Sequence, residues 1–218
     1  MLSDKYDIPK APSQKENLSV HSKNSKEIIK NMKVQEIKDR LISGNSSYIV
    51  DNEKLVSDSK LRKDLTNGQS PFAIVLSCAD SRVVPERIFD CNIGELFVVR
   101  VAGNIANTSS IASIEYAVAH LNCKMILVLG HESCGAVTAA VQGGDNGPNL
   151  NHLTDHISDA VKKGEGKDLS EIIKINAASN AKILTSKSEI LQNAVNQSGL
   201  VIESAYYNLG SGKVDFLD

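Results

Sequence analysis

The sequence lacks an apolar run long enough to cross a membrane. Its longest run, around residues 125–130, is far shorter than the ~20 apolar residues that a membrane-spanning helix needs. An excess of charge of one sign is also missing, since 24 Lys and Arg face 26 Asp and Glu, for a net charge of −2. Nucleic-acid-binding proteins carry a basic surface that this balance does not supply. We therefore expect neither a membrane nor a nucleic acid as a partner.

A secretory signal and a disulfide framework are absent as well. The first twenty residues contain no basic segment followed by an apolar one, as a secretory signal would. The four cysteines, at positions 78, 91, 123 and 134, do not follow the spacing of small disulfide-rich proteins. The sequence thus predicts a cytoplasmic protein with free thiols. We expect Cys91 and Cys123 to be small buried residues, because free cysteine is among the most buried residue types.

The length of 218 residues suits one α/β domain with an attached arm. Residues 1–25 are polar and are predicted to form an N-terminal arm, which leaves residues 26–218 as a single domain. Apolar residues at 34, 37, 41 and 42 recur at helical spacing, and Gly44-Asn45 is expected to end that helix. A second, more polar helix is expected over residues 51–67.

Continuous apolar runs at 72–77, 95–101 and 125–130 are typical of strands buried on both faces. Later strands are expected at 200–208 and 213–216. The helices expected between and after the runs cover residues 109–121, 133–141, 151–163 and 168–198. This alternation predicts an α/β fold, with a mainly parallel β-sheet flanked by helices and an N-terminal helical arm.

Three potential metal ligands follow the ends of these strands. Cys78 comes directly after the first buried strand and His131 directly after the third, and ligands of open α/β sheets gather outside such strand ends. Cys134 lies three residues beyond His131, close enough for both side chains to reach one ion. Two thiolates and one imidazole are typical zinc ligands, and a catalytic zinc keeps a fourth position open. We prefer one Zn²⁺ per chain to the alternative of a turn-capping histidine beside a core cysteine.

Asp80 and Arg82 stand two residues apart and next to Cys78. In an extended turn both side chains can point to the same side, where the arginine can hold the carboxylate bidentately and keep it ionised. Beside a zinc thiolate we interpret them as a functional pair rather than as a structural ion pair. His152 and His156 have i, i+4 spacing but no third ligand nearby, so we expect them on a solvated helix face.

At these residues the chain resembles the β-class carbonic anhydrases. The similarity runs from about residue 33 to the C-terminus, and the pair of motifs C-x-D-x-R and H-x-x-C-G is its most specific part. The matching stretches are Gln69-Ser70-Pro71, Cys78-Ala79-Asp80-Ser81-Arg82, residues 94–100 (GELFVVR), Ala102-Gly103-Asn104, residues 113–117 (SIEYA) and Gly130-His131-x-x-Cys134-Gly135.

The resemblance implies an enzyme that reversibly hydrates carbon dioxide to bicarbonate and a proton. Cys78, His131 and Cys134 would hold the zinc, and a zinc-bound hydroxide would attack the substrate. Asp80, held by Arg82, would accept the hydroxide's hydrogen bond and orient it. In some family members this aspartate itself binds the metal, so Asp80 is also a candidate ligand.

The resemblance also implies a substrate pocket and a partner. The predicted lining consists of the Gln69 amide, the apolar surfaces of Phe97, Ala102 and Tyr116, and the Gly135 backbone N–H. Related enzymes build this cleft between two subunits, so a homodimer or tetramer is expected, with residues 26–218 as the catalytic domain.

Three other functions share some of these features. One is the hydrolysis of CS2 or COS on the same fold, and another is zinc binding without catalysis. The third is a nucleophilic enzyme using Cys134 or Cys78 with a histidine. The presence of Asp80, Arg82 and Gln69 argues against a purely structural zinc, which would not need them.

Overall fold

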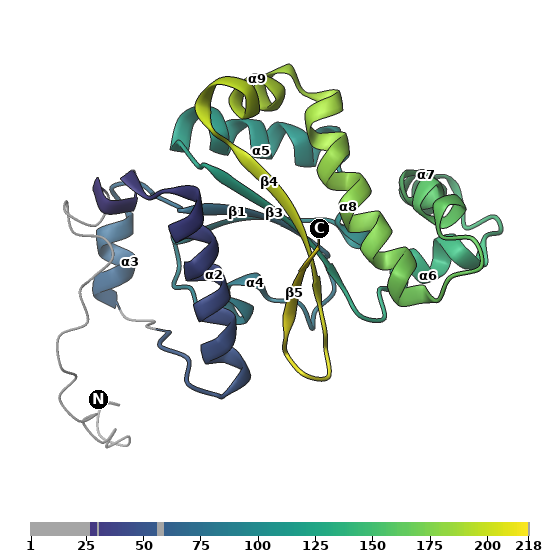
Figure 1. The fold of residues 1–218 in the computed structure, drawn as a ribbon, viewed down its shortest axis with the longest axis horizontal. Coiled ribbons are helices and arrows are strands. Elements are labelled where there is room, and N and C mark those ends of the chain that lie inside the picture. The colour runs from purple at the N-terminus through teal and green to yellow at the C-terminus, as the bar shows by residue number, and fades with distance from the viewer. Residues whose placement is uncertain (1–26, 30, 56–58, 218) are drawn as a thin grey trace, which may run out of the picture.

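A five-stranded sheet forms the centre of the molecule (Figure 1). The computed structural model describes residues 27–29, 31–55 and 59–217, so the predicted arm at 1–25 lies outside the described residues. In spatial order the strands are β2 (Leu96–Arg100), β1 (Ala73–Ser77), β3 (Met125–His131), β4 (Val201–Tyr207) and β5 (Val214–Leu217). The first four are parallel, and β5 pairs with β4 in the antiparallel direction. The predicted α/β fold with a mainly parallel sheet is thereby confirmed.

Helices connect the strands and cover both faces of the sheet (Figure 1). Their bounds are α2 (Val34–Ile49), α3 (Ser59–Leu65), α4 (Pro85–Ile88), α5 (Thr108–Leu121), α6 (Gly135–Gln142), α7 (Pro148–Lys163), α8 (Leu169–Lys187) and α9 (Glu189–Ser198), with a short 3-10 helix, η1 (Ala102–Asn104), after β2.

The alternation of side chains along β1 separates the two halves of the core. Val75 points to one face, where it joins Ile37 and Leu41 of α2 in a buried cluster. Ile74 and Leu76 point to the other face and pack with side chains of α5, α8 and α9. Because apolar side chains are buried on both faces, the strands read as continuous apolar runs in the sequence.

The predicted end of α2 at Gly44-Asn45 is wrong, because the helix continues through both residues to Ile49. Gly44 lies against the backbone of Phe89, and a Cβ atom at this position would collide with the Phe89 carbonyl oxygen. The buried Asn45 amide donates to the Ile88 and Gly212 carbonyls and accepts from the Val214 N–H. Close packing and these tertiary hydrogen bonds, rather than a helix stop, account for this glycine and asparagine.

Two other predicted helices differ in extent. Of the helix expected over residues 51–67, the described residues contain α3, Ser59–Leu65, while residues 51–55 are not helical and 56–58 lie outside the described residues. The helix expected over 168–198 is divided at Ser188, where the backbone is extended. The Ser188 hydroxyl accepts a hydrogen bond from the Leu191 N–H and thereby begins α9, as a serine cap does.

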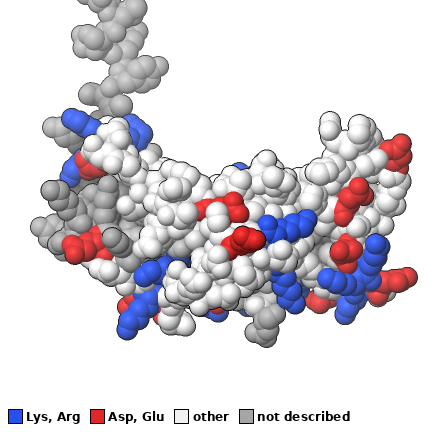
Figure 2. All heavy atoms as spheres, turned by 90° about the horizontal axis from the view of Figure 1, so that it is seen from above, with Lys and Arg blue, Asp and Glu red and all other residues white. Residues whose placement is uncertain are grey.

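Basic and acidic side chains are interspersed on the face shown in Figure 2, where most of the surface is uncharged. No large patch of one charge sign is visible on this face. Among the described residues, no helix has both the length and the apolar character that crossing a bilayer demands.

Candidate metal centre

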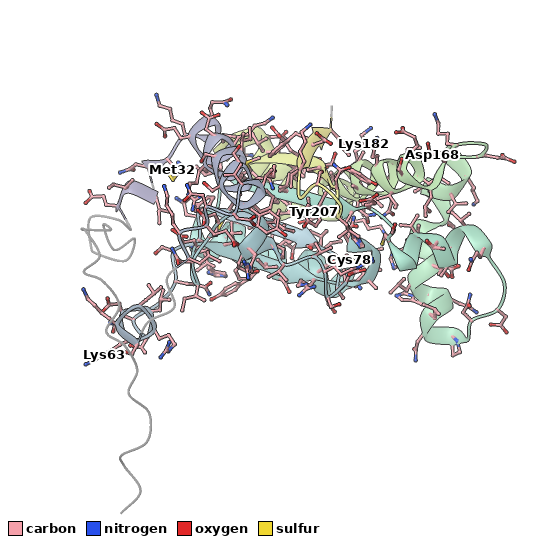
Figure 3. All side chains as sticks on the ribbon, turned by 90° about the horizontal axis from the view of Figure 1, so that it is seen from below. Met32, Lys63, Cys78, Asp168, Lys182 and Tyr207 are labelled. Atoms are coloured by element: carbon pink, nitrogen blue, oxygen red, sulfur yellow. The ribbon has the colours of Figure 1, made fainter. Side chains whose placement is uncertain are left out.

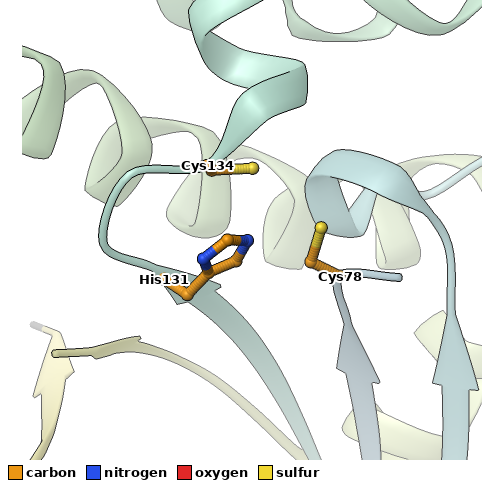
Figure 4. A group of neighbouring side chains, drawn as sticks. All are labelled: Cys78, His131 and Cys134. Atoms are coloured by element: carbon orange, nitrogen blue, oxygen red, sulfur yellow. The ribbon is translucent and has the colours of Figure 1, made fainter. Parts of the chain in front are cut away.

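Cys78, His131 and Cys134 converge at the carboxyl ends of the neighbouring strands β1 and β3 (Figure 4). Cys78 directly follows β1, His131 ends the adjacent strand β3, and Cys134 caps the start of α6. The parallel pairing of Ser77 with Leu129 brings the two strand ends together. The two sulfur atoms and a ring nitrogen lie within 4.8 Å of one another, and all three side chains are buried. The geometry therefore agrees with the prediction that strand ends bring these residues to one place.

The imidazole of His131 presents one nitrogen without a protein partner. Its Nδ1 lies 2.9 Å from the Glu132 carbonyl oxygen, which can only accept, so Nδ1 carries the proton in this hydrogen bond. Nε2 is then left with a free lone pair, and it is buried without a hydrogen-bond partner among the described residues. A backbone carbonyl on the distal nitrogen is the usual way in which a metal-binding histidine is oriented.

The two thiols influence each other's ionisation. The hydrogen bond from Cys134 lowers the pKa of Cys78 to about 4, while the same bond and burial raise the pKa of Cys134. Cys78 therefore ionises more readily than Cys134, and a bound cation would favour the thiolate form of both. Two thiolates and one unprotonated imidazole nitrogen fit Zn²⁺ and leave a fourth position for a small molecule.

Asp80 and Arg82 form a bidentate ion pair next to this cluster. Oδ1 of Asp80 accepts from the Arg82 backbone N–H and from Nε, both at 2.9 Å, and Oδ2 accepts from the guanidinium at 2.7 Å. These hydrogen bonds hold the pKa of the Asp80 carboxyl well below its usual range. Asp80 is therefore an ionised acceptor in a fixed orientation. Its oxygens are not among the three atoms that converge within 4.8 Å.

Two residues without a predicted positioning role fix the loop that carries Cys78 and Asp80. Arg100, the last residue of β2, donates to the Cys78 carbonyl at 3.0 Å and to the Asp80 carbonyl at 2.7 Å. The Gly103 N–H donates to the Cys78 sulfur at 3.3 Å. The sequence contains a signal for Arg100, since it lies near the end of the strand predicted over residues 95–101, and parallel pairing places it beside Ser77.

The predicted pocket residues fall into two groups. Ala102 begins η1 beside Gly103, and Gly135 follows Cys134, so both lie next to the cluster. Phe97 and Tyr116 lie together on β2 and α5, with ring centroids 6.4 Å apart.

Gln69 is exposed and precedes β1, so it lies at the end of the strands opposite to Cys78. It borders a cavity of about 300 Å³ together with Lys124, which directly precedes β3. A single chain thus brings Ala102 and Gly135 to the cysteines but not Gln69, because the whole of β1 separates Gln69 from Cys78.

The remaining cysteines and the histidine pair lie outside this cluster. Cys91 and Cys123 are 1% and 4% exposed, as predicted, and burial raises the pKa of Cys123 to about 12. His152 and His156 lie on α7 with their rings 4.9 Å apart, edge to face. Among the described residues, only Cys78, His131 and Cys134 form a group of three or more potential metal ligands.

Comparison with known proteins agrees with the geometry. A protein-family model described as "Carbonic anhydrase" matches residues 73–214. The chain is 33% identical to carbonic anhydrase 2 of Mycobacterium tuberculosis over 186 residues, which cover 82% of this chain and 90% of that protein.

Solved structures with a similar fold carry the same description. A structure from a report on two tetrameric β-carbonic anhydrases of Sordaria macrospora matches with a TM-score of 0.66 and 26% identity, over 72% of this chain and 85% of that one. A β-carbonic anhydrase of Aspergillus fumigatus matches with a TM-score of 0.64 and 26% identity, over 84% of this chain and 88% of that one.

Proposed function

This chain belongs to the β-carbonic anhydrase family, and from that premise we propose that it catalyses the zinc-dependent, reversible hydration of carbon dioxide to bicarbonate and a proton. The observation that supports this proposal most directly is the convergence of two thiols and the free Nε2 of His131 beside an ionised, oriented carboxylate. Zinc held by Cys78, His131 and Cys134 would supply a water of lowered pKa that reacts near neutral pH.

The protein's own contribution is orientation. Asp80, ionised and fixed by Arg82, accepts a hydrogen bond from the water that reacts and directs its lone pair toward the carbon of CO2. Because the Asp80 oxygens are held by Arg82 and are not among the atoms that converge within 4.8 Å, we assign Asp80 the role of acceptor rather than of metal ligand in this arrangement. The Gly135 N–H, at the start of α6, is suited to stabilise the negative charge that develops on a substrate oxygen.

Stopped-flow hydration of CO2 with a pH indicator, on protein of measured zinc content, tests the proposal. We expect rapid turnover at one zinc per chain. Full zinc occupancy without turnover between pH 6 and 9 would contradict it and favour a non-catalytic zinc protein. Turnover of CS2 or COS in place of CO2 would instead favour the hydrolase.

We further propose that the enzyme acts as a dimer or a larger multiple whose cleft lies between subunits. Gln69 lies at the edge of the sheet opposite to Cys78, so its amide reaches a substrate at the cluster only from a second copy. Tyr116, a residue that is 51% exposed, is suited to the same shared surface. The Sordaria macrospora enzymes of similar fold are described as tetrameric, which supports an assembly of several copies here.

Coexpression of two impaired variants tests this arrangement. Asp80→Asn and Gln69→Leu are each expected to be impaired alone. Together they are expected to regain about a quarter of wild-type activity, because half of randomly paired dimers are mixed and each mixed dimer has one intact site. If Gln69 acted within its own chain, every site would contain one substitution and coexpression would restore nothing.

A further inference from the structure

Two asparagines lie buried in the middle of α8. Asn176 is 0% exposed and Asn180 is 1% exposed. A buried amide is costly unless it is hydrogen-bonded, and asparagine is a poor helix former. Helix formation therefore does not explain these two asparagines, and their hydrogen bonds must be considered. Figure 3 labels Asp168, which caps the first turn of α8, and Lys182 further along the same helix.

The two amides hold the segment that follows β2. Nδ2 of Asn176 donates to the Gly103 carbonyl at 2.9 Å, and Oδ1 of Asn180 accepts from the Ala106 N–H at 2.7 Å. Nδ2 of Asn180 in turn donates to Oδ1 of Asn176 at 3.0 Å. This last bond fixes the orientation of the Asn176 amide, because it places the oxygen toward Asn180 and so turns the NH2 group toward Gly103.

The segment held in this way reaches the cysteine cluster. Gly103 donates its N–H to the Cys78 sulfur at 3.3 Å and uses its carbonyl to accept from Asn176. Its backbone is left-handed, with φ 71°, and a Cβ atom would lie 2.8 Å from Cδ1 of Ile157. A backbone conformation of this kind persists where surrounding contacts determine it, and the asparagine pair supplies such contacts.

We propose that Asn176 and Asn180 are positioning residues for the metal centre, and that they act through Gly103 to aim an N–H group at the sulfur of Cys78. The inference rests on the proposed zinc site. An N–H donor withdraws electron density from a thiolate and fixes its direction, as the outer partners of metal ligands do. The pair would thus set both the affinity for zinc and the electronic character of one ligand.

The test replaces each asparagine by leucine, which has nearly the same size and no polar atoms. The matched control is Asn45→Leu. Its amide is also buried and makes three hydrogen bonds, all to backbone groups of Ile88, Gly212 and Val214, outside the cysteine cluster. Zinc affinity is measured by competition with a chromophoric chelator, the electronic character of the thiolates by the sulfur-to-metal charge-transfer band of Co²⁺-loaded protein, and folding by circular dichroism.

We expect Asn176→Leu and Asn180→Leu to raise the zinc Kd by about 10- to 100-fold and to shift the Co²⁺ charge-transfer band. Asn45→Leu should lower the Tm and leave both metal readouts at wild-type values. If a leucine variant does not fold, Asn176→Asp provides the measurement, since it keeps the size and removes the donor to Gly103. Folded variants with wild-type Kd and band, or equal shifts in Asn45→Leu, would overturn the inference. Absence of zinc binding in the wild type would instead refute the proposed function.

Discussion

Replacing His131 by alanine is expected to remove bound zinc and CO2 hydration together. Nε2 of His131 is buried without a protein partner among the described residues, and it lies with two sulfurs at a distance suited to one ion. Two buried thiols without the imidazole leave a zinc ion short of the three protein ligands that catalytic sites use. Metal content of dialysed protein and stopped-flow turnover measure the two effects. Only the uncatalysed rate should remain.

The control is His152→Ala, on the exposed surface of α7, which should keep one zinc per chain and full turnover.

Alkylation distinguishes the proposed zinc enzyme from a nucleophilic cysteine enzyme. Cys78 and Cys134 should resist iodoacetamide in the zinc-loaded wild type and react after chelation, because zinc would shield the two sulfurs from alkylation until it is removed. A zinc-free wild type that turns over normally would rule out the proposed chemistry.

Asp80→Asn is expected to lower kcat on the order of 10²-fold while zinc stays bound, because a misdirected nucleophile reacts more slowly. The carboxylate uses both oxygens to accept from Arg82 and has lone pairs left for the water that reacts. An asparagine has one acceptor oxygen, so it cannot satisfy the arginine fork and the water together. Stopped-flow rates from pH 6 to 9, with zinc measured in parallel, provide the comparison.

Asp159→Asn makes the same chemical change on α7, where the side chain is 78% exposed, and should leave kcat unchanged. Arg82→Lys tests the fork itself, since lysine keeps the charge but cannot bind both carboxylate oxygens in parallel. Its kcat should fall between those of Asp80→Asn and the wild type. An Asp80→Asn enzyme with normal kcat would mean that the carboxylate does not orient the nucleophile.

The strands and the placement of the cluster are predictable from the sequence because both depend on local patterns. Apolar runs mark the strands, and a parallel sheet gathers their carboxyl ends, which places Cys78 and His131 at one edge. The end of α2 is predicted wrongly because Gly44-Asn45 has the local pattern of a helix stop. Its actual determinants are the backbone of Phe89 and hydrogen bonds to residues far along the chain.

The hydrogen bonds that hold the segment beside the cluster are not predictable either, because they also join residues that are far apart in the sequence. Asn176 and Asn180 bond to residues 73 and 74 positions away, and no local pattern marks such a pairing. Gln69 shows a further limit. Its motif matches the family, yet one chain leaves it at the opposite edge of the sheet from the cysteines. Its proposed role depends on a second copy, and a single sequence does not specify the arrangement of copies.

Two of the three predicted ligands lie at the ends of adjacent parallel strands, and the third caps the helix that follows, which has a consequence for how a metal would be exchanged. The backbone ladder and the apolar clusters on both faces of the sheet fix the strand ends before any ion arrives. In zinc fingers, by contrast, the metal must organise the chain, and much of its binding free energy is consumed by folding. Here the ion meets a preorganised set of donors. We therefore expect loading and removal of zinc to be local events in a protein that stays folded, with the binding free energy retained as affinity.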